Sequence, residues 1–499
     1  MKFLSLYFKI FAMNEYKIFI NGNFVDGRGG IGEVINPHDN SILAKYHIAS
    51  KEDVDLAVKS AREGFEKWKN LSINKRIRIL QNLSKLLSEN LDKIAQIETL
   101  NVGKPINASK TEISAGISVL EFYIGAINKI MGETIPTLPG HFNYTIREPI
   151  GVCALIVPWN YPLMLTLWKL SPALACGNSV IIKPASWTPL SALELAKLCK
   201  EAGIPDGVVN VITGPGNEIG SYLVSHEGIN KISFTGETKT GSEIMKLASN
   251  TIKRVSLELG GKSANIVFED ADLEDAINGS IWAIYYNSGQ SCEARSRLFI
   301  HKKIYDKFLS EFTEKTKKIK IGNPINKETQ MGPLVSKSHL NSVHKYVEKG
   351  LEEGAKLIYG GKKIENEDLK NGNYYMPTIL ELNSTENICF KEEIFGPVVV
   401  VMSFESEEEA IKLANNSKYG LAGTIWTRDV KRAIRVSNSI RAGSITINHP
   451  LTAIPGLPFG GYKQSGFGRE LSLDAIELFT EKKSVIYKFD ETPVNPWNL

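Results

Sequence analysis

Short apolar runs alternate with helical patterns between residues 151 and 268. The apolar runs are GVCALIV, SVIIKP, VVNVI, KISF and VSLEL, and segments between them, such as LMLTLWKLSPALA and SALELAKLCKEAG, repeat apolar residues every three or four positions. Strands and helices in alternation indicate a parallel, doubly wound sheet. Such sheets bind ligands at the carboxyl ends of their strands, where this chain has the loops PWN, KPAS and FTGETKTG. The pattern therefore predicts an α/β fold with a nucleotide crevice.

The segments on either side extend this picture. Residues 51–130 look mainly helical, and residues 265–450 repeat the alternation with NIVF, RLFIHK, VVVVMSF and SITIN as apolar runs. Residues 131–149 and 480–499 fit neither pattern and read as extended strands. We therefore expect two doubly wound α/β units and a small β arm made from these two segments.

Composition limits the class of protein and its partners. The chain has 499 residues, 42% hydrophobic and 23% charged, which is typical of a soluble globular protein of about two to four domains. The net charge is +4, and no Lys/Arg run is dense enough to indicate a nucleic-acid partner. Residues 152–168 are apolar, but Pro158, Asn160 and Pro162 lie at their middle, so we interpret them as a strand, a loop and a helix rather than a membrane span.

The chain start and the cysteines bear on location. The first twelve residues, MKFLSLYFKIFA, could suggest a signal peptide or anchor, but Lys9 interrupts the apolar run and no A-x-A-like cleavage site follows. Met13 is a second candidate start. Five scattered cysteines without a CxxC pair indicate a reducing compartment, and we expect a cytoplasmic protein without a metal site.

Glycines mark the candidate phosphate-binding positions. There is no Walker loop, and the match nearest to GxGxxG, from Gly214 to Gly220, has one residue too many. In FTGETKTG, Gly236 and Gly241 open a helix whose free N–H groups suit a pyrophosphate, although a tight strand-to-helix turn would look the same. Lys183 ends a strand, where it could bind ribose hydroxyls or simply be solvated.

Three other residues could carry covalent chemistry. Cys292 sits in a small-residue polar turn, NSGQSC, whereas a structural cysteine usually lies in an apolar run. Glu258 ends an apolar strand, where burial could raise its pKa and make it a general base, or it could be a surface acid before a turn. Asn160 could donate its amide to an oxyanion, or form an Asx turn in its Pro-rich loop.

The order of these motifs resembles the aldehyde dehydrogenase superfamily from about residue 16 to the C-terminus. The matching features are Asn160, Lys183, FTGxxxxG, ExGG, GQxC, the EIFGP that begins at Glu393, and the PFGGYKQSG that begins at Pro458. The resemblance implies an NAD(P)-binding domain over 14–130 and 150–262, and a catalytic domain over 263–450. It also implies an oligomerisation arm over 131–149 and 480–499, and hence a homo-oligomer, either dimer or tetramer.

By the same resemblance, roles follow for individual residues. Cys292 is the nucleophile, Glu258 the general base, and Asn160 an oxyanion donor together with the Cys292 N–H, while Lys169 and Glu470 match a proton relay. The expected cofactor contacts, together with the helix-opening glycines, are Val157, Trp159, Lys183, Ser186, Gly216, Gly236, Thr238, Gly241, Gly260, Glu393 and Phe395.

The expected reaction is oxidation of an aldehyde to an acid. The Cys292 thiolate adds to the carbonyl, hydride passes to the nicotinamide, and Glu258 activates water to hydrolyse the thioester. A cysteine esterase or acyl transferase, an acylating enzyme that uses coenzyme A, and a non-catalytic protein are the alternatives.

Three residues depart from the family pattern. Ser186 stands where NAD-preferring members commonly have an acid, so we expect NAD or NADP to be used, with NADP accepted. Glu237 stands where a small residue often faces the pyrophosphate. Glu293, directly after the nucleophile, is uncommon and could face the substrate entrance.

The sequence leaves the particular aldehyde open. Tyr161, Trp168, Glu293 and Phe459 are the candidate pocket residues. Tyr161 and Trp168 resemble the aromatic box of betaine-aldehyde members, where a ring face attracts a cation, but aromatic residues could equally line an apolar tunnel. Semialdehydes and broad aliphatic or aromatic aldehydes remain possible, although neither Arg295 nor Arg297 is clearly placed to hold a carboxylate.

Overall fold

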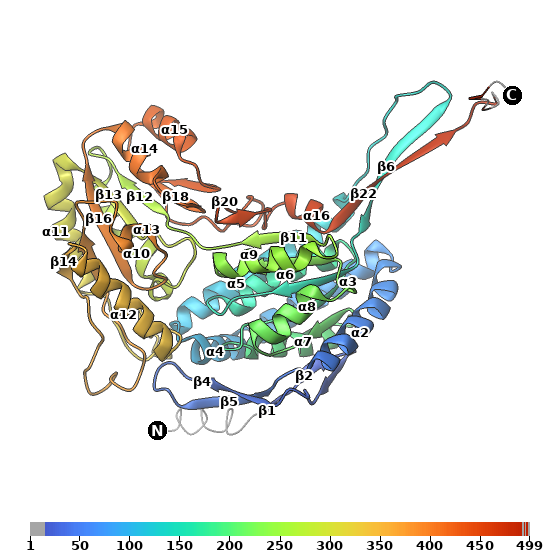
Figure 1. The fold of residues 1–499 in the computed structure, drawn as a ribbon, viewed down its shortest axis with the longest axis horizontal. Coiled ribbons are helices and arrows are strands. Elements are labelled where there is room, and N and C mark those ends of the chain that lie inside the picture. Colours follow the sequence, from blue (N-terminus) through green and yellow to red (C-terminus); the bar gives the residue numbers. More distant parts are fainter. Residues whose placement is uncertain (1–14, 492–493, 495, 498–499) are drawn as a thin grey trace.

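The computed structural model describes residues 15–491, 494 and 496–497. Two mainly parallel sheets lie in separate α/β units, and a two-stranded antiparallel ribbon projects from the body beside the first unit (Figure 1). This confirms the expected α/β fold. The predictions about the first twelve residues concern a part of the chain that lies outside the described residues.

The first sheet has eight strands. Their order is β21 (Gly466–Phe467), β11 (Arg254–Glu258), β10 (Lys231–Thr235), β7 (Val152–Ile156), β8 (Ser179–Lys183), β9 (Val209–Val211), β2 (Ile18–Ile20) and β3 (Asn23–Val25). The five strands from β11 to β9 are parallel, as the sequence pattern predicts, and the outer strands are antiparallel. The carboxyl ends of the parallel strands therefore share one edge.

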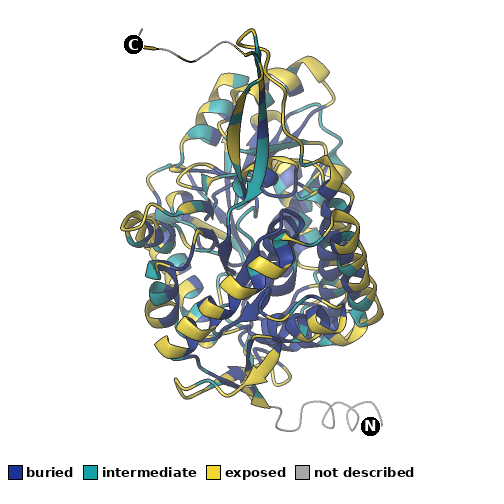
Figure 2. Cartoon of the chain, turned by 90° about the vertical axis from the view of Figure 1, so that its right-hand side faces the viewer, coloured by how far each residue is buried: buried dark blue, intermediate teal, exposed yellow. Residues whose placement is uncertain are grey.

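Helices cover both faces of this sheet. They are α2 (Lys51–Lys69), α3 (Ile73–Glu89), α4 (Leu91–Val102), α5 (Ile106–Ala126), α6 (Pro162–Ala175), α7 (Leu190–Glu201), α8 (Ser221–Ser225) and α9 (Thr238–Ser249). Because successive side chains of a strand point to opposite faces, Val152, Ala154 and Ile156 of β7 pack in the core with α2, α8 and α9. Cys153 and Leu155 pack in the other core, with α3 to α7. Figure 2 shows both cores buried around the sheet.

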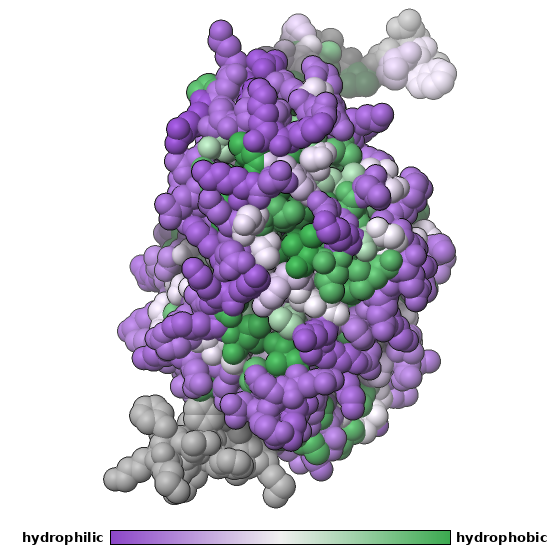
Figure 3. All heavy atoms as spheres, turned by 90° about the vertical axis from the view of Figure 1, so that its left-hand side faces the viewer, coloured by the Kyte–Doolittle hydropathy of each residue, from purple (hydrophilic) through white to green (hydrophobic). Residues whose placement is uncertain are grey.

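The second sheet has seven strands. Their order is β14 (Lys356–Tyr359), β15 (Thr378–Glu381), β16 (Val398–Phe404), β13 (Arg297–His301), β12 (Ala264–Val267), β18 (Ala422–Trp426) and β19 (Ser444–Ile447), and only β14 is antiparallel to its neighbour. Its helices are α10 (Leu273–Tyr285), α11 (Tyr305–Thr316), α12 (Lys337–Glu352), α13 (Ile388–Lys391), α14 (Glu407–Asn415) and α15 (Val430–Ser439). The side of the molecule shown in Figure 3 is mainly hydrophilic, with smaller hydrophobic areas between the polar side chains.

A short return segment joins the two units, which the sequence pattern did not predict. After β19 the chain forms β20 (Tyr462–Lys463), which pairs with β17 (Tyr419–Gly420) of the second unit. Only two residues later, β21 pairs with β11 of the first sheet. Residues 462–467 are thus hydrogen-bonded to both units, and α16 (Asp474–Leu478) follows them.

The two-stranded ribbon is formed by the two segments that we expected to make an arm. β6 (His141–Pro149) and β22 (Thr480–Lys488) are antiparallel over nine residues each, and this two-stranded ribbon stands away from the body in Figure 1. Residues 131–140 carry only an isolated bridge from Thr134 to Tyr144, so the expected strand is shorter than 131–149.

Three strands near the chain start form a small separate sheet, with β1 (Glu15–Tyr16) and β4 (Ile31–Ile35) flanking β5 (Ile42–His47). Among the residues that the structure describes, no helix combines the length and the apolar character needed to cross a bilayer.

Candidate active site

Cys292 lies on a loop that follows a strained turn. The turn, η3 (Tyr286–Gly289), contains Asn287 and Ser288 with φ of 50° and 57°. Non-glycine residues rarely adopt this left-handed conformation, and when they do, the surrounding structure must stabilise it. Here the side-chain amide of Gln290 donates to the Asn287 carbonyl at 3.1 Å, and its Oε1 accepts from the Val335 N–H at 2.9 Å. The loop that carries the thiol is therefore held rigidly.

The electrostatic surroundings keep the resting thiol protonated. Cys292 is partly buried, and burial raises the pKa of its thiol well above the usual value. The negative charges of Glu293, Glu393 and Glu258 raise this pKa further. A thiol in this environment needs a nearby base to become a nucleophile.

Glu258 is buried at the carboxyl end of β11 and is placed to be that base. Burial raises the pKa of its carboxyl well above the usual value, and so does the charge of Glu470, while Lys169 and Arg469 oppose the increase. Its Oε2 accepts no hydrogen bond from any residue that the structure describes. This oxygen can therefore take a proton from water or from a thiol.

Lys169 and Glu470 form a buried ion pair, with the ammonium nitrogen 2.5 Å from the carboxylate oxygen. Lys169 comes from α6, and Glu470 follows the return segment, where its backbone exchanges two hydrogen bonds with Phe459. The two residues are thus brought together, as the family resemblance implies, and their charges act on Glu258.

Asn160 faces the cysteine loop. Its side-chain nitrogen donates to the carbonyl of Gln290 at 2.9 Å. Its own backbone carbonyl accepts from the Lys104 ammonium at 2.7 Å and from the Asn287 amide at 3.2 Å. The amide that we expect to hold the oxyanion is therefore bonded to the residue two positions before Cys292, and Asn160 is fixed at both its backbone and its side chain.

The pair Gly260-Gly261 explains the ExGG motif. A Cβ at position 260 would lie 2.2 Å from the carboxylate of Glu393, and a Cβ at position 261 would lie 2.1 Å from the carbonyl oxygen of Cys292. The Gly261 N–H donates to Glu393 at 2.9 Å. Close approach of backbone at these two positions therefore brings Glu258, Glu393 and Cys292 into one site.

The carboxyl ends of β7 and β8 lie side by side, where we expect the nucleotide crevice. The Val157 N–H donates to the Lys183 carbonyl at 3.2 Å. Lys183 is buried, which lowers the pKa of its ammonium to about 8, and its side chain packs against Gly220. The Ser186 hydroxyl donates to the Gly214 carbonyl at 2.8 Å. A serine at this position carries no negative charge.

The start of α9 has free N–H groups, but Gly241 does not supply one. Gly236 follows β10, and Thr238 begins the helix after Glu237, whose side chain makes no capping hydrogen bond. The Gly241 N–H is already bonded to the Glu237 carbonyl at 3.0 Å, and a Cβ there would lie 2.6 Å from Leu259. This corrects the expectation for Gly241, which serves helix-to-strand packing. Glu237 is exposed, and its negative charge raises the pKa of Glu393.

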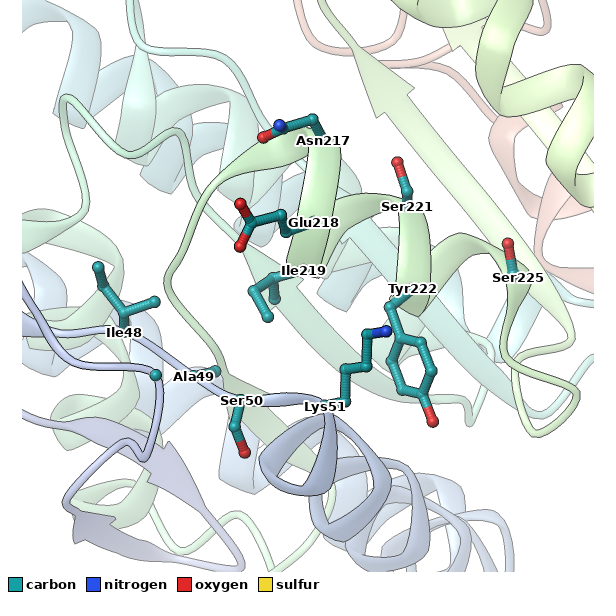
Figure 4. A pocket seen from close by; sticks show the side chains of 11 residues that line it. Ile48, Ala49, Ser50, Lys51, Asn217, Glu218, Ile219, Ser221, Tyr222 and Ser225 are labelled. Carbon is teal, nitrogen blue, oxygen red and sulfur yellow. The ribbon is translucent and has the colours of Figure 1, made fainter.

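A cavity of about 590 Å³ adjoins this crevice (Figure 4). It lies between the start of α2 and the turn η2 (Gly216–Gly220), and Lys51, Glu218 and Tyr222 line it. The Cβ position of Gly216 is open, since no described atom lies within 4 Å of it. The backbone of this turn is thus accessible to a ligand.

Aromatic side chains link the crevice to the second unit. Trp159 lies edge-on to His339 and Phe395, with ring centroids 5.2 and 5.3 Å away. Phe395 has a φ of 59°, and its carbonyl is hydrogen-bonded to His339 at 2.8 Å. Burial also raises the pKa of Glu393 to about 7. Trp159 of the first unit thus contacts Phe395 of the second, two residues after Glu393.

Three of the candidate pocket residues, Tyr161, Trp168 and Phe459, lie in the hydrophobic core against which Cys292 packs. Trp168 and Phe459 pack edge-to-face, with ring centroids 5.4 Å apart. The Lys104 ammonium lies 4.3 Å from the centroid of the Tyr161 ring, so an internal cation already contacts this ring. Glu293 pairs with Arg295 at 3.3 Å.

Both candidate arginines are committed to internal contacts. Arg295 donates to the Glu293 and Pro450 carbonyls at 2.8 Å and to the Thr424 hydroxyl at 3.0 Å. Arg297 donates to four backbone carbonyls. Neither guanidinium is therefore available as a dedicated clamp for a substrate carboxylate.

Sequence reasoning missed Lys104 and Glu112. They form a buried ion pair beside Asn160 and Tyr161. Lys104 stands between Gly103 and Pro105 in a turn between two helices, where a lysine would ordinarily be solvated. Only the tertiary structure reveals its burial.

A thiol that traps a carbonyl beside a dinucleotide crevice defines a class of oxidoreductase that acts on aldehydes. A model of the aldehyde dehydrogenase family matches residues 24–485. The betaine aldehyde dehydrogenase of Bacillus subtilis is 43% identical over 487 residues, covering 96% of this chain and 99% of that protein. An aldehyde dehydrogenase of Davidiella tassiana is 45% identical over 472 residues, or 94% of each chain. The structure of a Bacillus cereus aldehyde dehydrogenase with NAD+ superposes with a TM-score of 0.94 at 44% identity, covering 98% and 99% of the chains.

The chain therefore belongs to the aldehyde dehydrogenase family. It is an oxidoreductase that acts on the aldehyde group with NAD(P) as the class of cofactor.

Proposed function

We propose that Cys292 is the nucleophile of an NAD(P)-dependent aldehyde dehydrogenase that releases a free acid. The observation that carries this proposal is the contact of the Glu393 carboxylate and the Cys292 backbone with Gly260-Gly261, two residues after the buried Glu258. Gly216, the first turn of α9, Lys183 and Glu393 would hold the dinucleotide, since the backbone is open there and the lysine is buried beside it. The bound dinucleotide supplies the hydride acceptor.

The residues of the chain would act in sequence. Glu258 accepts the proton of the Cys292 thiol, and the sulfur adds to the aldehyde carbon. Asn160 and the Cys292 N–H stabilise the resulting alkoxide. Once hydride has left, a thioester remains on Cys292. Lys169 and Glu470 would carry the thiol proton away from Glu258, which their buried contact supports. The carboxylate of Glu258 can then remove a proton from the attacking water, and the acid is released as the Cys292 thiolate leaves.

We further propose that aldehydes without a negative charge are preferred. Glu293 places a carboxylate next to the nucleophile, and both nearby arginines are committed elsewhere. Tyr161, Trp168 and Phe459 supply aromatic surface for a neutral or cationic group. The relative from Bacillus subtilis is a betaine aldehyde dehydrogenase, which supports testing a cationic aldehyde. A semialdehyde substrate is the alternative.

Both cofactors are proposed to be used, because Ser186 is neutral where an acid would repel a 2′-phosphate. A panel of cationic, neutral and anionic aldehydes with NAD and with NADP tests these proposals together. Reduced cofactor should accumulate in proportion to acid, fastest with uncharged or cationic aldehydes. Acid formed without reduced cofactor would instead indicate a hydrolase, and a requirement for coenzyme A would indicate an acylating enzyme.

The two-stranded ribbon of β6 and β22 is proposed to be an oligomerisation arm. Phe142, Ile486, Tyr487 and Phe489 expose apolar side chains on or beside it, and exposed apolar groups of this kind favour contact with another chain. A homodimer or a tetramer would result.

Because Cys292 has to remain a free thiol to act, we also propose a reducing, cytoplasmic location.

A further inference from the structure

Lys104 is a fully buried cation that touches the oxyanion loop directly. It lies in the turn between α4 and α5, where Gly103 has a φ of 90° and Pro105 starts the next helix, and this turn directs the side chain inward. A buried ammonium is costly unless its donors are satisfied. Its partners therefore indicate what it does.

The ammonium of Lys104 has three partners, all close to the reaction site. It pairs with the Glu112 carboxylate and donates to the Asn160 carbonyl at 2.7 Å. The Tyr161 ring lies on a further side, with its centroid 4.3 Å away. Lys104 thus contacts the backbone of the proposed oxyanion donor and the aromatic residue that follows it.

Glu112 extends the contact to the cysteine loop. Its second oxygen accepts from the Tyr286 hydroxyl at 3.2 Å. Tyr286 begins the strained turn in which Asn287 has its left-handed conformation, and the Asn287 amide donates to the same Asn160 carbonyl as Lys104 does. Two donors from different units therefore converge on one carbonyl oxygen.

We propose that Lys104 and Glu112 are positioning residues that set the orientation of Asn160 relative to Cys292. This inference rests on the proposed function, in which Asn160 holds the oxyanion. The geometry of such a donor is critical, because a misplacement of about 1 Å can lower a rate about 100-fold. Fixing the Asn160 carbonyl leaves its side-chain amide directed at the cysteine loop.

The test is a double-mutant cycle between Lys104→Met and Asn160→Ala. Methionine keeps the length of the side chain and removes the N–H donors. If Lys104 acts through Asn160, K104M lowers kcat about 10-fold to 100-fold in the wild-type background, but less than about threefold when N160A is already present. The KM for NAD should stay within about twofold, because none of the partners of Lys104 is itself a proposed cofactor contact.

Two further variants keep the result interpretable. K104M alone strands the Glu112 carboxylate, so K104M/E112Q removes both charges and should fold while showing the same loss of kcat. Arg76→Met is the matched control: Arg76 is also a buried cation that donates to a backbone carbonyl, that of Ala175 at 2.9 Å. Melting temperatures of all variants report the structural cost.

Four results would separate the possibilities. An equal fold-loss of kcat for K104M in both backgrounds would overturn the inference, as would a folded K104M/E112Q enzyme with wild-type kcat. A similar loss of kcat in R76M would show that removing any buried cation has this effect, which would also overturn it. If N160A itself kept wild-type kcat, the proposed role of Asn160 would fail, and that outcome is visible without any Lys104 variant.

Discussion

Replacing Gly261 with alanine should impair catalysis by displacing the nucleophile loop. The new Cβ would lie 2.1 Å from the Cys292 carbonyl oxygen and 3.2 Å from the Leu421 Cβ. Real Cβ contacts are essentially never closer than 3.0 Å, so the Cys292 backbone has to move by about 1 Å. A shift of about this size at a reacting group costs about 100-fold in rate, and overpacking costs about 1–3 kcal/mol of stability.

Gly125→Ala is the matched control. Gly125 is exposed in α5, and no described atom lies within 4 Å of its Cβ position. Alanine there should raise stability by about 0.5–1 kcal/mol through helix propensity and leave kcat unchanged.

The assay measures kcat from the absorbance of the reduced nicotinamide, with aldehyde and cofactor saturating. Thermal unfolding shows whether each variant is folded, and the rate of Cys292 alkylation by iodoacetamide reports the accessibility of the thiol. A folded G261A enzyme with wild-type kcat would refute the reasoning, because it would mean that the thiol loop tolerates a displacement of its own carbonyl.

Other substitutions test the remaining roles. Cys292→Ala should abolish aldehyde oxidation at an unchanged melting temperature, and residual oxidation would remove the proposed nucleophile. Because the raised pKa of Glu258 leaves it protonated at low pH, the steady-state rate should increase as pH rises through that pKa. Glu258→Gln should remove this dependence and lower the steady-state rate on the order of 100-fold. Ser186→Glu should lower kcat/KM for NADP about tenfold or more relative to NAD. Ile486→Lys should shift the sedimentation of the protein toward a smaller assembly if the two-stranded ribbon joins subunits.

Periodicity and motif order predicted the parts of the molecule that local sequence determines. The strands from β7 to β11 fall where apolar runs end in polar loops, and Cys292 lies where small polar residues replace an apolar run. Glu258 is buried with a raised pKa, as its place at a strand end suggested.

Features that depend on distant contacts could not be predicted in this way. The burial of Lys104 depends on Glu112 and on the Asn160 loop. The N–H of Gly241 is used within its own helix, which a count of glycines does not reveal. The pairing of β21 depends on a strand some 200 residues earlier in the chain, and strands of two residues are too short to give a periodic pattern.

Residues 462–467 give the enzyme a second mechanical connection across its cleft. The polypeptide first crosses between the units after β11, and this later segment is bonded to β17 on one side and to β11 on the other. Backbone bonds join the units again where the Ile106 N–H donates to the Pro324 carbonyl at 2.8 Å and the Asn373 N–H to the Pro37 carbonyl at 3.0 Å. Around Trp159 and Phe395 the units meet through aromatic contacts, so we expect any widening to be greatest there. A bound dinucleotide could then exchange when that edge loosens, while Glu258 and Cys292 keep their spacing.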